Sequence, residues 1–307
     1  MAKEFHQIQW GERLEDDIRQ LVRLAIREDL DGRYDWTTVA LVSDSSTASA
    51  SLVAREAGVV AGLVALPTVL DEVESTQIEW TPNTQDGASV RAHETLGTLR
   101  GPTRELLTLE RQMLNLVGHL SGIATLTSQF VQHTDGTPAQ IYDTRKTQLG
   151  YRKLEKYAVN CGGGRNHRTG LFDAILIKDN HLAHCRDETS RSAGQAVRAA
   201  REFVTQNLPE LAAEMIIEVE VDNLEQLRDV LTETPDIVLL DNMSTAQLAK
   251  AVQIRDALAS TVELEASGGI DLLTIRSISE TGVDRVSVGA LTHSSPCFDV
   301  GLDWDIN

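Results

Sequence analysis

Aromatic residues and cysteines are scarce in this 307-residue chain. Phe, Trp and Tyr make up 4% of the residues, so stacking on exposed nucleobases is not expected to be its main mode of binding. The three cysteines, Cys161, Cys185 and Cys297, are isolated and form no C-x-x-C pair. This usage favours a reducing cytoplasm over a disulfide framework. The formal net charge of −18 argues against binding to a nucleic-acid backbone or an anionic membrane surface.

Long apolar segments suited to a membrane are not evident. The uncharged run Ala57–Leu70 has 14 residues and contains Gly58, Gly62 and Pro67, so it is too short and too interrupted to span a bilayer. The first residues are polar and contain no apolar signal core. We therefore expect a cytoplasmic protein with neither nucleic acid nor membrane as a partner. The apolar content of 41% and the charged content of 24% are typical of globular proteins, and the length suits one large or two ordinary domains.

One segment is basic within this acidic chain. Asp143–Lys178 holds eight Lys or Arg residues and three acidic residues, a local excess of five positive charges. Three successive glycines, 162–164, lie in its middle, and no G-K-[ST] motif follows them, so the segment is not a P-loop. Such a concentration of cations needs an anion to bind. The segment therefore predicts a pocket for a small polyanion.

The first third of the chain predicts a mixed α/β domain. Apolar residues at helical spacing predict a helix over 12–30 and another from Thr103, a credible N-cap, to about Phe130. Gly118 and Gly122 are expected to kink or divide this second helix. Short strands are predicted at 51–55, 59–63, 77–80 and 89–93, with a helix at 67–73 among them.

After residue 137, apolar strands each end in a polar or small residue. The strands with their last residues are 140–143, 174–178, 215–220, 237–241, 262–267 and 285–289. Helical patterns fill the gaps between them, and this alternation predicts parallel βα units. We expect an α/β barrel whose active site lies at the carboxyl ends of the strands. Six strands are fewer than the usual eight, so the barrel is expected to be incomplete; an open doubly wound sheet is the alternative.

The strand ends collect residues with complementary chemistry. Cations are offered by Arg145, Lys146, His167, Arg168 and Lys178; carboxylates by Glu220 and Asp241; and small turns by Ser267-Gly268-Gly269 and Gly289-Ala290. The last strands of such barrels commonly bind phosphate through backbone N–H groups. The two carboxylates end neighbouring strands and suit a hard cation or a sugar hydroxyl.

Three residue sets leave alternatives open. Lys178 could be a Schiff-base nucleophile, although the neighbouring carboxylates disfavour the lowered pKa that this needs. His181, His184 and Cys185 could bind zinc, but a position at a helix start explains the two histidines better. Arg111 would ordinarily be a solvated residue on a helix surface.

These motifs, in this order, resemble the quinolinate phosphoribosyltransferase family. The resemblance rests on DTRKT (143–147), GGG-x-NHR (162–168), KDNH (178–181), EVEV (218–221), LLDN (239–242) and SGGI (267–270). It spans residues 110–293 and extends weakly to 28–30 and 37–38. Two departures concern loop stiffness: Tyr34-Asp35 stands where the family usually has Gly-Asp, and Leu149 where it usually has Pro.

The resemblance implies a reaction and a role for each residue. The family forms nicotinate mononucleotide, carbon dioxide and pyrophosphate from quinolinate and phosphoribosyl pyrophosphate with Mg²⁺. The implied acceptor-binding residues are Thr144, Arg145, His167, Arg168 and, from a second subunit, Arg111. The implied catalytic residues are Lys146, Lys178, Glu220 and Asp241, and the two carboxylates would also hold Mg²⁺. The implied 5′-phosphate site consists of Ser267, Gly268, Gly289 and His293.

The resemblance also implies the architecture and the assembly. It predicts an N-terminal α/β sandwich domain over 1–115, an open α/β barrel over 116–285, and a C-terminal segment, 286–307, that returns to the first domain. A homodimer or a larger homo-oligomer with shared active sites is implied. The competing interpretations within enzymes are a relative that binds another pyridine carboxylate and a paralogue of uncertain substrate linked to molybdenum transport. A non-catalytic sensor of phosphorylated ligands is the alternative from another class, although a sensor has no need of leaving-group cations such as Lys146 and Lys178.

Overall fold

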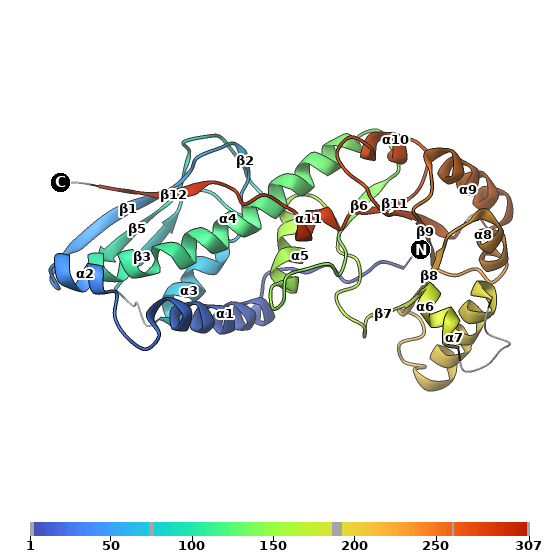
Figure 1. Cartoon of the computed structure of the whole chain (residues 1–307), viewed down its shortest axis with the longest axis horizontal. Coiled ribbons are helices and arrows are strands. Elements are labelled where there is room, and N and C mark those ends of the chain that lie inside the picture. Colours follow the sequence, from blue (N-terminus) through green and yellow to red (C-terminus); the bar gives the residue numbers. More distant parts are fainter. Residues whose placement is uncertain (1–2, 74–76, 186–191, 260, 306–307) are drawn as a thin grey trace. The chain divides into compact units, whose positions relative to one another are not determined.

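The computed structural model describes residues 3–73, 77–185, 192–259 and 261–305 (Figure 1). They form two compact units. The N-terminal unit consists of Ile8–Ser128, Thr147–Gly163 and the residues from Leu291 onward. The barrel unit consists of the residues up to Gln7, Gln129–Lys146 and Gly164–Ala290. No helix formed by the described residues is long and apolar enough to cross a lipid bilayer.

The N-terminal unit contains a four-stranded antiparallel sheet in the order β12-β1-β5-β3. Its strands are β1 (Thr47–Ala54), β3 (Glu79–Pro82), β5 (Thr95–Pro102) and β12 (Val300–Trp304), and β2 (Gly58–Val59) pairs separately with β4 (Ser89–Val90). The sequence did not predict β5, because Gly97, Gly101 and Pro102 are poor strand formers. Gly97 is required there: a Cβ at this position would lie 2.2 Å from the Trp80 ring on β3.

The first helix of this unit is the one that the sequence predicted over 12–30. The helices of the unit are α1 (Glu12–Leu30), α2 (Trp36–Leu41), α3 (Leu66–Glu72), most of α4 (Thr103–His133), α5 (Arg152–Cys161) and the end of α11 (Ala290–His293). Helix α1 matches the predicted range 12–30 and buries Leu14, Ile18 and Val22. The predicted strand at 59–63 is shorter than expected, because Gly62 has a φ of 97° and the chain turns there into the 3-10 helix η1 (Leu63–Ala65).

One long helix, α4 (Thr103–His133), is continuous, so the expectation that glycines divide it is wrong. Gly118 and Gly122 instead admit the backbone of the C-terminal segment. A Cβ at Gly118 would lie 2.9 Å from the carbonyl oxygen of Phe298, and one at Gly122 only 2.0 Å from that of Pro296. The two glycines are therefore needed for close packing within the N-terminal unit.

Replacement of Gly122 by alanine is expected to destabilise the protein. The new Cβ would displace the backbone at Pro296, and overpacking of this kind costs about 1–3 kcal/mol, which outweighs the ~1 kcal/mol that alanine gains in a helix. The urea midpoint measures this loss. Gly11→Ala is the matched control, because Gly11 has an extended φ of 168° and no atom within 4 Å of its Cβ position. An unchanged midpoint for Gly122→Ala would contradict the packing argument.

The barrel unit is built on the six strands that the sequence predicted, and all described pairings between them are parallel. They are β6 (Gln140–Tyr142), β7 (Ala174–Ile177), β8 (Ile216–Val221), β9 (Ile237–Asp241), β10 (Glu263–Ser267) and β11 (Arg285–Ser287). The sheet order is β6-β11-β10-β9-β8-β7, and among the described residues β6 and β7 do not pair, so the barrel is not closed. The predicted combination of an N-terminal α/β domain with an open, incomplete α/β barrel is confirmed.

Helices follow the strands and cover the outside of the sheet, as Figure 1 shows for α7 to α9. They are α6 (Asp179–Ala183), α7 (Ala193–Asn207), α8 (Leu224–Leu231), α9 (Thr245–Leu258) and α10 (Ile275–Ser279). Three of them begin at side-chain caps. Ser192 and Ser244 form capping boxes with Gln195 and Gln247, and Asn223 accepts hydrogen bonds from the start of α8.

The first residues of the chain are part of the barrel unit. Lys3 Nζ donates to the carbonyl oxygen of Met215 at 2.7 Å, and Glu4 pairs with Arg285 at 3.2 Å. Phe5 is buried in a core cluster with Tyr142, Ala174, Ile216 and Ile237. This segment, to which the sequence pattern assigned no element, thus fills the interior of the sheet beneath the strand ends.

Candidate active site

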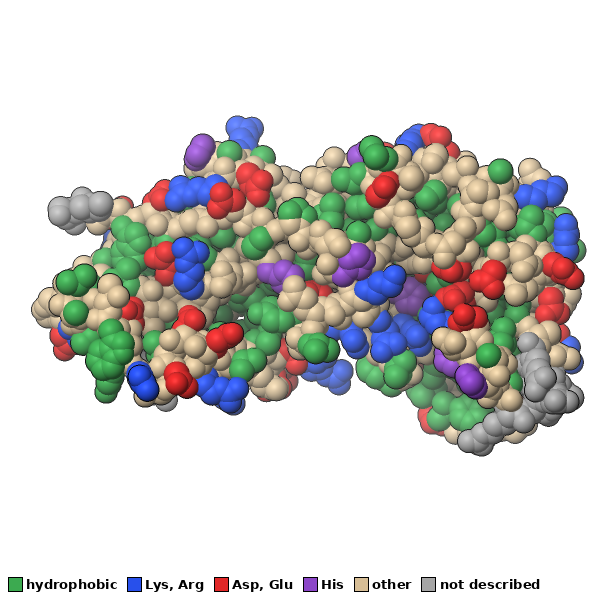
Figure 2. Space-filling model, viewed as in Figure 1, with side chains coloured by type: hydrophobic (Ala, Val, Ile, Leu, Met, Phe, Trp, Pro, Cys, Tyr) green, Lys and Arg blue, Asp and Glu red, His purple; other side chains and the backbone are tan. Residues whose placement is uncertain are grey.

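The carboxyl ends of the six parallel strands bring most of the predicted site residues to one edge of the sheet. Lys178 follows β7, Glu220 lies near the end of β8, Asp241 ends β9, Ser267 ends β10 and Gly289 follows β11. The strand registers place all five on the same face, because side chains alternate along each strand. Figure 2 shows Lys and Arg side chains gathered beside Asp and Glu side chains on the part of the barrel unit around β7 and β8.

Lys178 and Glu220 form an ion pair across two neighbouring strands. The Glu220 side chain is mostly buried, and that of Lys178 is 39% exposed. This contact therefore favours a role for Lys178 as a fixed cation rather than as a neutral Schiff-base nucleophile.

Two arginines lie close enough to repel each other. Burial lowers the pKa of the Arg168 guanidinium, and the charge of Arg145 lowers that pKa further. The Nε atom of Arg145 is buried and has no hydrogen-bond partner among the described residues. Arg168 is buried, and its guanidinium makes a long 3.5 Å contact with the carbonyl oxygen of Ala174. Adjacent like charges with a buried donor that lacks a partner are arranged to receive an anion.

The loop that carries Arg168 is anchored by Asp143, directly after β6. The Asp143 carboxylate is fully buried and accepts 2.8 Å hydrogen bonds from the backbone N–H of His167 and from the Asn166 side chain. Residue 165 also forms a parallel bridge with Tyr142. Asp143 and Asn166 are positioning residues that the sequence analysis did not identify, although both lie within its motifs.

The His167 side chain faces inward, toward two buried glutamates. Its Nε2 atom lies 3.0 Å from Glu218 Oε2 and 3.6 Å from Glu265 Oε1. Burial and the charge of Glu218 raise the pKa of the Glu265 carboxyl. Sequence analysis missed both glutamates. A signal was present, since each lies two residues before a candidate site residue, on the same face of its strand.

The turn after β10 packs tightly against the turn after β9. Gly268 has a φ of 102°, and a Cβ there would lie 2.2 Å from Asn242 Oδ1. The backbone N–H of Asn242 donates to the carbonyl oxygen of Ser267 at 2.9 Å, and the Asn242 side chain donates to Asp241 at 2.7 Å. Glycine at 268 is thus required by packing, while the Ser267 hydroxyl and the neighbouring backbone remain candidates for phosphate binding.

Two predicted site residues belong to the N-terminal unit. Arg111 is exposed on α4, and no described residue forms an ion pair with its guanidinium. His293 ends α11, is exposed, and its Nδ1 lies 2.5 Å from the Ser294 hydroxyl. His181, considered for zinc, lies within α6 and its Nδ1 accepts from the backbone N–H of Lys178 at 2.9 Å, a contact that fits a helix cap.

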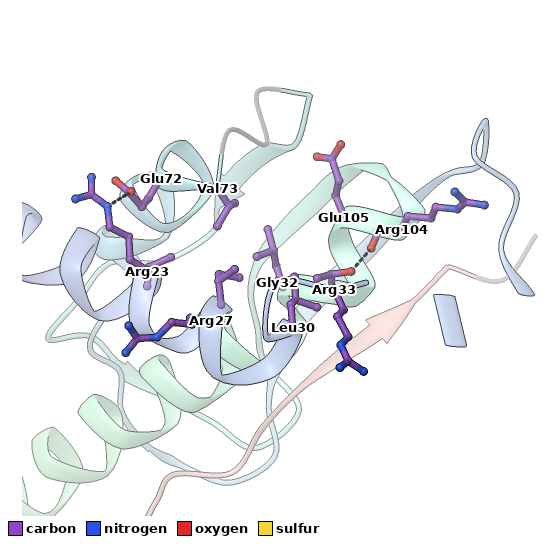
Figure 3. Close-up of a pocket in the computed structure, with 13 residues that line it drawn as sticks. Arg23, Arg27, Leu30, Gly32, Arg33, Glu72, Val73, Arg104 and Glu105 are labelled. Atoms are coloured by element: carbon purple, nitrogen blue, oxygen red, sulfur yellow. Dashed lines mark hydrogen bonds and ion pairs between the residues drawn. The ribbon is translucent and has the colours of Figure 1, made fainter. Parts of the chain in front are cut away.

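A separate cavity of about 620 Å³ lies in the N-terminal unit, between α1, the end of α3 and the start of α4. Figure 3 shows its lining, with Arg23 joined to Glu72 at the rim. Its walls are largely apolar, and Arg104 at the rim donates to backbone and side-chain oxygens at the end of α2 and beyond it. It holds none of the residues that the sequence identified as site candidates.

An open parallel α/β barrel that gathers cations and carboxylates at its strand ends defines an enzyme for small anionic substrates. Models of the quinolinate phosphoribosyl transferase N-terminal and C-terminal domains match residues 35–121 and 123–303. The chain belongs to the quinolinate phosphoribosyltransferase family.

Individual relatives agree with this assignment. The chain is 47% identical to the nicotinate-nucleotide pyrophosphorylase [carboxylating] of Mycobacterium leprae, over 94% of this chain and 97% of the relative. It is 33% identical to a mitochondrial quinolinate phosphoribosyltransferase [decarboxylating] of Nicotiana tabacum, over 94% and 82% of the two chains. The solved nicotinate-nucleotide pyrophosphorylase of Francisella tularensis superposes with a TM-score of 0.86 at 35% identity, covering 98% of this chain and all of that one.

The activity follows from the family. The enzyme transfers the phosphoribosyl group of phosphoribosyl pyrophosphate to quinolinate with decarboxylation. The products are nicotinate mononucleotide, carbon dioxide and pyrophosphate, a step in the biosynthesis of NAD. The paralogue and sensor interpretations of the sequence are thereby set aside.

Proposed function

We propose that Arg145 and Arg168, with Thr144, bind the two carboxylates of quinolinate. The observation that carries this proposal is that the two guanidinium groups lie close together, with Arg168 buried and the Nε donor of Arg145 buried without a hydrogen-bond partner among the described residues. A planar dicarboxylate such as quinolinate supplies oxygen acceptors for the N–H groups of these two guanidiniums. His167 was also predicted to bind the carboxylates, but both of its ring nitrogens are engaged inside the barrel, so we propose that it contributes by holding Arg168.

Lys146 and Lys178 are proposed to neutralise the departing pyrophosphate. Lys146 is exposed, and its backbone N–H donates to the Thr144 hydroxyl at 3.0 Å, which holds the loop in a turn. The pyridine nitrogen of quinolinate forms a bond to ribose C1 while the C1–oxygen bond breaks and its electron pair leaves with pyrophosphate. The transition state is oxocarbenium-like, so the rate of phosphoribosyl transfer depends on positioning and electrostatics. The C2–carboxylate bond then breaks, carbon dioxide leaves, and the ring carbanion, stabilised by the pyridinium charge, takes a proton from solvent.

Glu220 and Asp241 are proposed to hold the ribose hydroxyls and Mg²⁺. Their donor chemistry fits this ion, because they are carboxylates at the ends of the neighbouring strands β8 and β9, and Mg²⁺ is usually bound by one or two carboxylates together with substrate phosphates. When bound, the ion would screen charge on the pyrophosphate. Ser267, Gly268, Gly289 and His293 are proposed to bind the 5′-phosphate.

We further propose that the enzyme is a cytoplasmic homodimer or larger homo-oligomer with shared sites, in which Arg111 enters the acceptor pocket of a second subunit. Its exposed guanidinium, for which no described residue is an ion-pair partner, supports this role. In a closed two-fold dimer, each subunit would contribute its Arg111 to the acceptor pocket of the other.

Replacement of Lys146 by alanine is expected to lower kcat roughly 10²-fold, with a smaller effect on the KM for quinolinate. Loss of a charge that acts on the leaving group weakens the transition state more than the ground state. Steady-state assays of pyrophosphate release measure both constants. Lys250→Ala is the control, because Lys250 is an exposed lysine of the same unit on α9 whose ammonium donates to Gln253. A normal kcat with a raised KM for quinolinate would instead assign Lys146 to acceptor binding.

A further inference from the structure

Two glutamates lie one layer beneath the candidate site and have no part in the reaction as described so far. Glu218 on β8 and Glu265 on β10 have no exposed surface. They precede Glu220 and Ser267 by two residues, so they face the same side of the sheet, deeper in its interior. Burying a carboxylate is costly, and a buried ionic cluster is weak evidence of a purely stabilising role.

The hydrogen bonds of His167 define its protonation state. Its Nδ1 atom accepts the backbone N–H of Arg168 at 2.8 Å, so Nδ1 carries no proton. An accepting Nδ1 implies a neutral ring with its proton on Nε2, and Nε2 is hydrogen-bonded to Glu218 Oε1 at 3.3 Å. Phe5 stacks on the ring with a centroid distance of 4.3 Å and restricts its rotation.

The two glutamates differ in what they do for this ring. Glu218 lies within hydrogen-bond distance of Nε2, whereas Glu265 approaches no closer than 3.6 Å. Neither oxygen of Glu265 has a hydrogen-bond partner among the described residues. Glu218 is thus the acceptor that selects the Nε2–H tautomer, and the second carboxyl lies beside it.

We propose that Glu218 is a positioning residue for acceptor binding: it accepts a hydrogen bond from the Nε2–H of His167 and so keeps Nδ1 unprotonated, as the acceptor that holds the backbone N–H of Arg168. Glu218 on β8 would thus position Arg168 through the imidazole ring of His167, and the guanidinium of Arg168 is proposed to bind quinolinate. The inference rests on the proposed role of Arg168. Without the acceptor at 218 the ring can rotate or change tautomer, and the backbone N–H of Arg168 loses its partner inside the barrel.

The same three groups have a competing explanation as ligands of a metal ion. The ligand atoms of His167, Glu218 and Glu265 all lie within 4.8 Å of one another. Nε2 is hydrogen-bonded to Glu218 Oε1 at 3.3 Å, and this direct contact favours the positioning role. Elemental analysis of the purified enzyme by mass spectrometry tests the alternative: one equivalent of zinc, iron or manganese, lost in a Glu218 variant, would overturn the proposal.

The kinetic test compares two substitutions at 218. Glu218→Leu removes the acceptor and is expected to raise the KM for quinolinate about tenfold, equivalent to ~1.4 kcal/mol, while the KM for phosphoribosyl pyrophosphate stays within about threefold. Glu218→Gln keeps an oxygen acceptor and should restore most of the quinolinate affinity. Glu265→Gln is the matched control, a buried glutamate with the same substitution, and should change the quinolinate KM less than about threefold.

Several outcomes would overturn the inference. Equal rises in both KM values for Glu218→Leu would indicate general damage to the fold, and a Glu265→Gln enzyme as impaired as Glu218→Leu would remove the assignment to Glu218. Arg168→Ala separates this failure from that of the proposed function. If Arg168→Ala raises the quinolinate KM and Glu218→Leu does not, only the positioning role fails; if neither does, the acceptor role of Arg168 fails first.

A measurement on the unaltered enzyme keeps the proposal testable if Glu218→Leu does not fold. Nitrogen-15 NMR of histidine-labelled protein, with the His167 signals assigned by comparison with His167→Asn, reports which ring nitrogen carries the proton. We expect a neutral Nε2–H ring in the wild type. A ring protonated on Nδ1, or on both nitrogens, would overturn the proposal.

Discussion

Nicotinate is expected to be a far poorer acceptor than quinolinate. It lacks the 2-carboxylate, so at least one of the two guanidiniums, that of the buried Arg168 or the half-buried Arg145, would face the substrate without an anionic partner. Leaving a buried charge unpaired in this way costs about 2–5 kcal/mol. At 1.4 kcal/mol for each factor of ten, kcat/KM should fall about 30- to 4,000-fold. Both acceptors yield nicotinate mononucleotide, so one product assay measures both.

The arginine variants supply the control for this experiment. Arg145→Ala and Arg168→Ala should each weaken quinolinate use, and the variant that lacks the partner of the 2-carboxylate should discriminate less between the two acceptors than the wild type does. Their energies are not expected to add, because the two guanidiniums interact. Equal turnover of quinolinate and nicotinate by the wild type would contradict the proposed roles of both arginines.

Arg111→Ala is expected to be nearly inactive, although the same substitution on an ordinary exposed helix surface would be almost neutral. The proposed reason is that Arg111 completes the acceptor pocket of a second subunit. Mixing Arg111→Ala with Lys146→Ala and allowing subunit exchange should therefore restore activity. With random exchange of equal amounts, half of the dimers are mixed and one of the two sites in each is intact. Recovery should approach roughly a quarter of wild-type activity.

A second mixture is the matched control for subunit exchange. Lys146→Ala and Lys178→Ala both alter the barrel unit, so every site in their mixed dimer lacks one lysine and no recovery is expected. Exchange itself can be followed with differently tagged subunits. Absence of recovery in the Arg111→Ala mixture, with exchange demonstrated, would mean that Arg111 acts in its own subunit or supports the fold.

The sequence by itself was sufficient to predict the strands of the barrel unit and the residues at their ends. Each strand is an apolar run that stops at a polar or small residue, as in Ile237–Asp241, and this local pattern needs no knowledge of distant contacts. Parallel strands collect their carboxyl ends at one edge, so Lys178, Glu220 and Asp241 could be assigned to one site before the structure was known. The ordered motifs were also sufficient to indicate the family.

Only the tertiary structure decided the strand order, the packing role of the glycines on α4 and the layer of residues beneath the site. Gly118 and Gly122 suggested a divided helix, because the C-terminal segment that they admit lies more than 170 residues away in sequence. Phe5, His167, Glu218 and Glu265 come from four distant segments and meet only when the strands are placed side by side. A buried carboxylate depends on those neighbours for its hydrogen bonds and its charge state, and local sequence does not contain them.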